Sequence, residues 1–137
     1  LKKKNIIFLD TAKATSFEST KFALSNSKKI YWIFGGFPKK NDKIDLSGIE
    51  KNIIKGYLIG KNISFFQKQI KNKINFSITK NLDKSLIQIF KDIKFSDTKD
   101  NTILLSPAAA SYDQFINFEK RGDKFKKLSK LYARKFI

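Results

Sequence analysis

A run of small and hydroxyl-bearing residues follows an apolar segment in the last third of the chain. Residues 102–105 are apolar or β-branched, Pro107 and a run of alanines come next, and Ser111 then precedes Tyr112-Asp113-Gln114-Phe115. An apolar strand that turns at small residues into a helix brings backbone N–H groups and a hydroxyl together, which is an arrangement that binds anions. Ser111 is therefore a candidate anion-binding residue.

Two hydroxyl residues also fit the pattern of a helix N-terminus. Thr15 and Glu18 form a T-x-x-E capping box, and Ser111 and Gln114 form the matching S-x-x-Q pattern. Each cap stabilises a helix by about 1 kcal/mol, and spacing alone favours capping over binding. The two roles are compatible, because a capped helix start still presents N–H groups and a positive dipole to a carboxylate.

Two lysines stand at positions where they can meet an anion. Lys13 follows the apolar residues 6–9, and Lys39 follows Gly35-Gly36 and Pro38. A lysine at a loop tip supplies a compact charge that can close over a carboxylate or a phosphate. Residue type alone does not distinguish either of them from the many solvated lysines of this chain. Only their positions in the sequence support a role in anion binding.

Short apolar runs alternate with segments of helical period along the chain. This alternation predicts an α/β fold with a Rossmann-like open, mostly parallel sheet and flanking helices, because parallel strands need right-handed helical crossovers. The expected strands are residues 6–9, 30–34, 57–59, 74–78 and 102–105, and the expected helices are residues 17–24, 63–70 and 82–93.

The remaining helices and one loop are predicted from shorter sequence patterns. A short helix is expected around residues 46–49, after a lysine-rich surface loop at residues 39–43. After residue 105 we expect two helices, starting near Asp113 and Asp123, with Gly122 as the C′ residue between them. The side chains of the second helix that should face the sheet are Phe125, Leu128, Leu131 and Tyr132.

Composition limits the class of protein. The 137 residues fit one domain, and the absence of Met suggests a segment of a longer protein. Cys and His are absent as well, which removes disulfides, the commonest metal ligand and the commonest general base. No apolar stretch approaches the roughly 20 residues that span a bilayer, so a cytoplasmic setting without membrane contact is the simplest expectation.

The net charge of +17 would suit a nucleic-acid-binding module. Arg121 and Arg134 are the only arginines, however, whereas proteins that read base edges depend on the bidentate guanidinium. The lysines are spread over the chain with many Ile, Asn and Phe residues, which a compositional bias explains. Nucleic-acid binding is kept as the alternative, and the main expectation is no nucleic-acid partner.

A nucleotide-binding motif of its own is missing. Residues 56–61 resemble a phosphate-binding loop, but the first glycine is one position too close and Asn62 replaces the Ser/Thr that would bind magnesium. No G-x-G-x-x-G follows the first strand, and no metal site or catalytic triad is expected. The sequence therefore predicts a binding domain without catalytic residues.

Three blocks together resemble the C-terminal domain of the Mur ligases, and within them the branch that adds D-glutamate. The blocks are Lys13-Ala14-Thr15 with Glu18-Ser19-Thr20, then Gly35-Gly36 with Pro38-Lys39, and last the run from Leu104 through Phe118 and Arg121-Gly122-Asp123 to Phe125. The resemblance spans nearly the whole chain. Thr11 departs from it, because the family usually has an aspartate there and here Asp10 lies one position earlier, and Ala109 replaces a frequent cysteine.

The resemblance implies a role for each block. Residues 1–137 would form a single domain, the C-terminal amino-acid-binding domain of a larger multi-domain ligase. Thr15, Lys39, Ser111 and the backbone at Phe118 would hold D-glutamate, and Lys13 would contact the nucleotide phosphates. D-glutamate carries two carboxylates, so a cation and two sets of oriented donors suit it.

The resemblance also implies the reaction of the whole enzyme. ATP and Mg²⁺, bound mainly by other domains, would activate UDP-N-acetylmuramoyl-L-alanine as an acyl phosphate for peptidoglycan biosynthesis, and the amine of D-glutamate would attack it. We expect the domain to be monomeric and to have no ligase activity alone. A family member specific for another amino acid remains a further alternative.

Overall fold

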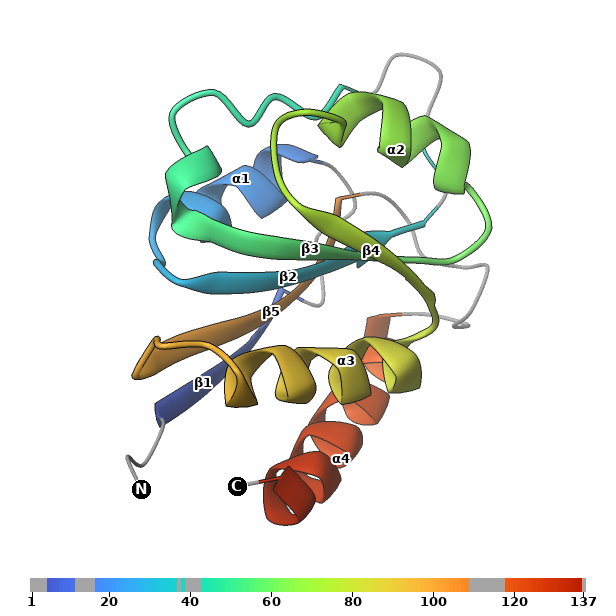
Figure 1. Cartoon of the computed structure of the whole chain (residues 1–137). Coiled ribbons are helices and arrows are strands. Elements are labelled where there is room, and N and C mark those ends of the chain that lie inside the picture. The colour runs from blue at the N-terminus through green and yellow to red at the C-terminus, as the bar shows by residue number, and fades with distance from the viewer. Residues whose placement is uncertain (1–4, 12–16, 37, 39–42, 109–117, 137) are drawn as a thin grey trace.

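The computed structural model describes residues 5–11, 17–36, 38, 43–108 and 118–136, and Figure 1 shows one sheet with helices on both faces. In chain order the elements are β1 (Asn5–Asp10), α1 (Phe17–Ser25), β2 (Ile30–Gly35), the 3-10 helix η1 (Glu50–Asn52), β3 (Ile53–Ile59), α2 (Ile63–Ile70), β4 (Phe76–Lys80), α3 (Leu82–Lys94), β5 (Asp100–Ala108) and α4 (Phe118–Phe136).

β2 forms the centre of the fold because its sequence is apolar on both faces. All six of its residues, Ile-Tyr-Trp-Ile-Phe-Gly, are buried. Successive side chains of a strand point to opposite faces, so Trp32 and Phe34 enter one core cluster while Tyr31 and Ile33 enter the other. A strand that is buried on both sides is typical of a parallel sheet covered by helices on both faces.

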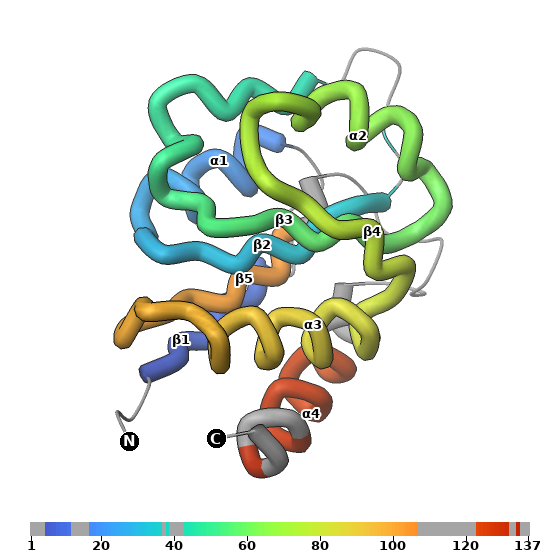
Figure 2. Tube along the Cα trace, in the orientation of Figure 1, coloured from blue at the N-terminus to red at the C-terminus, as the bar shows by residue number. Residues whose placement is uncertain are grey.

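The strands are ordered β1-β5-β2-β3-β4. All four neighbouring pairs are parallel, which confirms the expected open α/β sheet. Figure 2 shows that β5, the last strand in the sequence, lies between β1 and β2. The carboxyl ends of β1, β5 and β2 are therefore adjacent at one edge of the sheet, which we call the carboxyl edge.

The helices divide between the two faces according to the direction of their crossovers. α1 and α2 lie on one face, and α3 and α4 lie on the other (Figure 1). The connection through α3 runs back from β4 to β5, opposite in direction to the connections through α1 and α2. Right-handed crossovers of opposite direction place their helices on opposite faces. α3 packs on the sheet through an apolar stripe of buried residues, which comprises Leu82, Leu86, Ile89, Phe90 and Ile93.

The predicted helix break at Gly122 is wrong, because α4 runs through this residue. A glycine inside a helix costs about 1 kcal/mol relative to alanine, and the burial of Phe125 and Leu128 against the sheet outweighs that cost. Leu131 was expected to face the sheet, but 57% of it is exposed. The predicted start near Asp113 and the side chain of Tyr132 lie outside the described residues.

Element boundaries differ from the sequence-based expectation at several elements. The helix expected at residues 46–49 is absent there, and the helical turn is η1, which follows directly at Glu50–Asn52. Asn52 anchors it by donating from Nδ2 to the Leu24 carbonyl at 3.0 Å. β3 begins at Ile53 rather than at Tyr57, because its pairing with β2 starts at Ile30. β4 covers Phe76–Lys80 rather than residues 74–78.

Candidate functional site

The carboxyl edge of the sheet is where the sequence-predicted site residues would converge. β1 ends at Asp10, β2 at Gly35 and β5 at Ala108. The register pairs Asp10 with Leu105 and Gly35 with Ala108, so these strand ends are neighbours. Ligands of open α/β sheets bind outside the carboxyl ends of the strands, at points where the strand order reverses.

The structure does not describe the side chains of the predicted site residues. Lys13, Thr15, Lys39 and Ser111 are outside the described residues, and Phe118 is described as the first residue of α4, without its side chain. The structure therefore brings together the strand ends from which these segments leave. The arrangement of the side chains themselves stays a prediction, as do the capping boxes of Thr15 and Ser111.

A chain of hydroxyl groups joins the ends of β1 and β5 to α1. The Thr11 hydroxyl donates to Ser106 Oγ, and Ser106 Oγ donates to Thr20 Oγ1 at 2.8 Å. Ser106 and Thr20 are fully buried. The indole Nε1 of Trp32, in β2, donates to the Ser106 carbonyl at 2.9 Å. Three strands and one helix are thus tied together beneath the carboxyl edge.

This hydroxyl chain gives Thr11 a structural role at the position where the resembling family has an aspartate. The Thr11 backbone N–H donates to the Leu105 carbonyl at 3.1 Å, which extends the pairing of β1 with β5 by one residue. Asp10, at the end of β1, is exposed. Sequence reasoning missed the part of Thr11 and Ser106, because a hydrogen bond between residues 95 apart leaves no local signal.

The end of β2 requires glycine. Gly35 has φ of +153° and Gly36 has φ of +122°, a region that residues with a side chain rarely adopt. A Cβ at Gly35 would lie 2.1 Å from the carbonyl oxygen of Ile59, at the end of β3. From the start of α2, Asn62 Nδ2 donates to the Gly36 carbonyl at 2.8 Å. The backbone that leads to Pro38 and Lys39 is therefore held from two sides.

The opposite edge of the sheet, where the strands begin, carries a different polar cluster. We call this edge the starting edge. Asp92 of α3 accepts from Tyr57 Oη at 2.6 Å, from Lys55 Nζ at 3.1 Å and from Gln88 Nε2 at 2.9 Å. Burial acts to raise the pKa of Asp92, but these three hydrogen bonds outweigh it, so the pKa lies below the ordinary aspartate value. Burial and the neighbouring Asp92 raise the pKa of the Tyr57 phenol.

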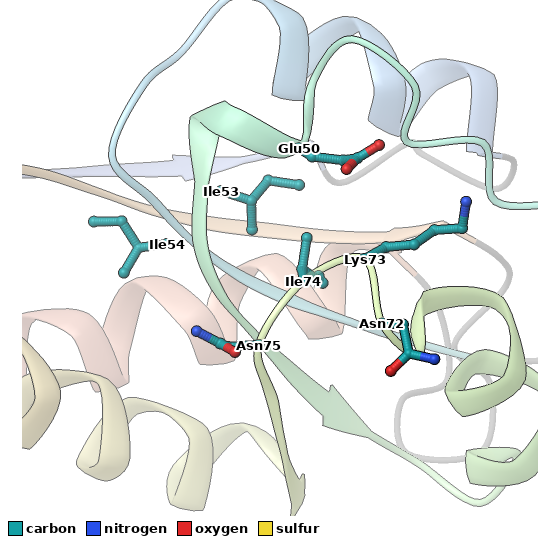
Figure 3. Close-up of a pocket in the computed structure, with 7 residues that line it drawn as sticks. All are labelled: Glu50, Ile53, Ile54, Asn72, Lys73, Ile74 and Asn75. Carbon is teal, nitrogen blue, oxygen red and sulfur yellow. The ribbon is translucent and has the colours of Figure 1, made fainter.

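Two cavities are away from the carboxyl ends of β1, β5 and β2. One, of about 420 Å³, is at the start of β3 and β4 (Figure 3), and its lining residues are Glu50, Ile53, Ile54, Asn72, Lys73, Ile74 and Asn75. The other, of about 320 Å³, lies between β4 and α3. The side chains around the first point in different directions in Figure 3 and do not converge on one point. None of the residues that line the two cavities is a predicted site residue.

The described residues bear on metal binding and on membrane-spanning helices. They contain no group of three or more His, Cys, Asp or Glu residues placed to hold a metal ion. Among the helices of the described part, none combines the length and the hydropathy that crossing a bilayer requires.

Comparison with known proteins finds curated relatives that share one name. No family model matches the chain. Curated relatives named UDP-N-acetylmuramoylalanine--D-glutamate ligase include those of Nitrobacter hamburgensis, 37% identical over 93% of the chain, and Agrobacterium fabrum, 39% identical over 88%. The relative from Wolbachia sp. subsp. Brugia malayi is 40% identical over 89% of the chain.

The matches cover only part of each relative. The chain spans 27%, 26% and 24% of the length of the three relatives, respectively. The matches cover 88–93% of the chain, and the structure has the α/β sheet that the alternation of apolar and helical segments predicted. The chain is therefore homologous to a segment of the UDP-N-acetylmuramoylalanine--D-glutamate ligases.

Proposed function

We propose that residues 1–137 form a single domain, the C-terminal, D-glutamate-binding domain of a ligase that joins D-glutamate to UDP-N-acetylmuramoyl-L-alanine. The observation that carries the proposal is the adjacency of the ends of β1, β5 and β2. The segments that leave these three ends contain the residues that the resemblance assigns to the amino acid and the phosphates. The names of the relatives support the choice of D-glutamate.

In the proposed site, each carboxylate of D-glutamate has its own donors. Lys39 supplies the cation, Thr15 and Ser111 supply hydroxyls, and the backbone at Phe118 supplies a further contact. Charge-assisted hydrogen bonds of this kind are roughly twice as strong as neutral ones. Holding the amine beside the activated alanine carboxyl makes an otherwise bimolecular attack effectively intramolecular.

The cofactors of the whole ligase belong to the proposal as well. ATP would supply the phosphoryl group that activates the alanine carboxylate as an acyl phosphate, and the attacking amine of D-glutamate would release phosphate. Lys13 would meet the nucleotide phosphates from this domain. Mg²⁺ and most of the nucleotide are assigned to other domains, as the resemblance implies.

An NMR titration of the 137-residue chain tests this function. We expect D-glutamate to shift amide signals near Thr15, Lys39 and Ser111, to act more strongly than L-glutamate, and to lose its effect in Ser111→Ala. A short DNA duplex is the control for the charge of +17. Shifts that appear only with DNA would contradict the proposal and favour the nucleic-acid module. An equal response to both enantiomers would contradict the assignment to D-glutamate.

The isolated chain is expected to form no amide bond, because Mg²⁺ and most of the ATP site are assigned to other domains and only Lys13 of this chain is assigned to the nucleotide. The measurement is phosphate release and amide formation with ATP, Mg²⁺, D-glutamate and UDP-N-acetylmuramoyl-L-alanine. Product formed by the chain alone would contradict the division of labour that we propose.

A further inference from the structure

Asn62 occupies a helix start but does not cap the helix. Asparagine at such a position usually accepts a hydrogen bond from an N–H of the first turn. Asn62 has φ of −91° and ψ of 48° and makes no side-chain cap hydrogen bond to α2. Its amide nitrogen donates instead to the Gly36 carbonyl, across 26 residues of sequence, at 2.8 Å. The side chain thus serves the end of β2 rather than its own helix.

Asn81 at the start of α3 is the natural comparison. It has φ of −144° and ψ of 172°, and its side chain accepts from the Lys84 N–H at 2.9 Å. The two asparagines follow neighbouring strands, β3 and β4, at the same edge of the sheet. Only Asn81 makes the expected cap, so helix formation does not explain the contact that Asn62 makes.

The Gly36 carbonyl is a position from which the following chain can be directed. The preceding Gly35 lies so close to the Ile59 carbonyl that no side chain fits. Lys39 lies three residues beyond Gly36, so its Cα is within about 11 Å of the Gly36 Cα even in a fully extended chain. Pro38 restricts the path further, because its ring fixes φ. Fixing Gly36 therefore limits where the lysine can reach.

We propose that Asn62 is a positioning residue of the amino-acid site, whose N–H group holds Gly36 and thereby directs the segment that carries Lys39. The inference rests on the proposed function, in which Lys39 binds a carboxylate of D-glutamate. This role requires an N–H donor in the side chain of residue 62. A residue that caps helices well but has no such donor cannot replace asparagine.

The test uses the same substitution at both asparagines of the 137-residue chain. Aspartate caps helices as well as asparagine does, but it has no N–H donor and would oppose a carboxylate to the Gly36 carbonyl. We expect Asn62→Asp to weaken D-glutamate binding by roughly tenfold, the scale of one lost hydrogen bond. We expect Asn81→Asp, whose cap is retained, to bind D-glutamate within a factor of about two of the unmodified chain.

A coupling measurement separates positioning from general loss of structure. If Asn62 acts through Lys39, Asn62→Asp weakens binding far less when Lys39→Gln is already present than when Lys39 is intact. A purely structural effect of Asn62→Asp would be the same in both backgrounds and would overturn the inference. Asn62→Ser serves as a second variant, because serine also caps a helix and its only donor is a hydroxyl on a shorter side chain than that of asparagine. It should weaken D-glutamate binding in the same direction as Asn62→Asp.

Amide chemical shifts of residues 36–43 provide a readout that needs no ligand. Asn62→Asp should shift these signals and Asn81→Asp should leave them in place. If the unmodified chain does not respond to D-glutamate, the proposed function is contradicted, and the amide shifts alone decide whether Asn62 directs this segment. Unchanged shifts in Asn62→Asp, or unchanged affinity in a chain that binds D-glutamate, would overturn the role of Asn62.

Discussion

The two edges of the sheet are held together by different kinds of interaction. At the starting edge, Asp92 collects hydrogen bonds and an ion pair from Lys55, Tyr57 and Gln88. At the carboxyl edge, the described ties are hydroxyl-to-hydroxyl bonds, glycine turns and an amide-to-carbonyl bond, as at Ser106 and Asn62. A cluster whose charges already satisfy one another has little left to offer a ligand. The neutral ties fix the backbone of the carboxyl edge without occupying the cations that the proposed site needs.

The largest effect should come from Gly35→Ala at the carboxyl edge. The new Cβ would lie 2.1 Å from a backbone oxygen of β3, so the two strands must separate. We expect a loss of about 3 kcal/mol or more in the free energy of unfolding, measured by urea denaturation. The control is Gly48→Ala, where φ is +81° and no atom lies within 4 Å, so only the backbone strain of about 1–2 kcal/mol is expected. Equal losses would show that the contact with Ile59 is unimportant.

The next effect is expected for Asp92→Ala at the starting edge. The substitution removes the partner of the buried Tyr57 hydroxyl and of the partly buried Lys55 ammonium. We expect a loss of about 2 kcal/mol in stability and no change in D-glutamate affinity. Urea denaturation and the NMR titration measure the two quantities. A marked fall in D-glutamate affinity would contradict the prediction that the starting edge contributes to stability and not to binding.

A smaller loss of stability, combined with a loss of binding, is expected for Ser106→Ala. The change removes the buried hydroxyl that links Thr11 to Thr20, at a cost of about 1–2 kcal/mol. D-glutamate affinity should also fall, because the ends of β1 and β5 lose their connection to α1. Ser85→Ala is the matched control, since Ser85 is fully buried and its hydroxyl bonds to Thr79 and to the Asn81 carbonyl. It should lower stability similarly and leave affinity unchanged.

The smallest effect concerns pH. The folded-state pKa of Asp92 is lowered below its ordinary value of 3.8, so its stabilising contribution is present above that value and is lost as the pH falls through the folded pKa. Asp92→Asn should therefore lose less stability on acidification than the unmodified chain. Thermal midpoints between about pH 2 and pH 7 provide the measurement. Parallel curves for the two proteins would show that the cluster does not favour the ionised carboxylate.

The sheet could be predicted from the sequence because its strands are apolar and its helices are amphipathic. The order of the strands could not, since the insertion of β5 between β1 and β2 depends on pairing between distant residues. The break expected at Gly122 was wrong because local preference was weighed without the burial of Phe125. The start of β3 was missed because Lys55 and Gly56 interrupt the apolar pattern inside a paired strand.

The candidate site divides in the same way. A glycine turn before Lys39 and a capping pattern at Ser111 are local signals that marked these residues as candidates, and the resemblance supplied their predicted role in binding. The supports around them are long-range contacts: Ser106 bonds to Thr20, and Asn62 bonds to Gly36. In the sequence, Asn62 stands out only as a departure from a phosphate-binding loop, and its sequence neighbours do not reveal its partner.

The central position of β5 has a consequence for the synthesis of the protein. Within the described part of the chain, β1 pairs only with β5, and the paired residues Asn5 and Asp100 are 95 positions apart. A ribosome therefore releases β1, with its apolar side chains, long before the strand that receives it. Such non-local pairing slows folding and leaves strand edges open to other chains in the meantime. We expect nascent chains that stop before β5 to need a chaperone, whereas chains that include it can close their own sheet.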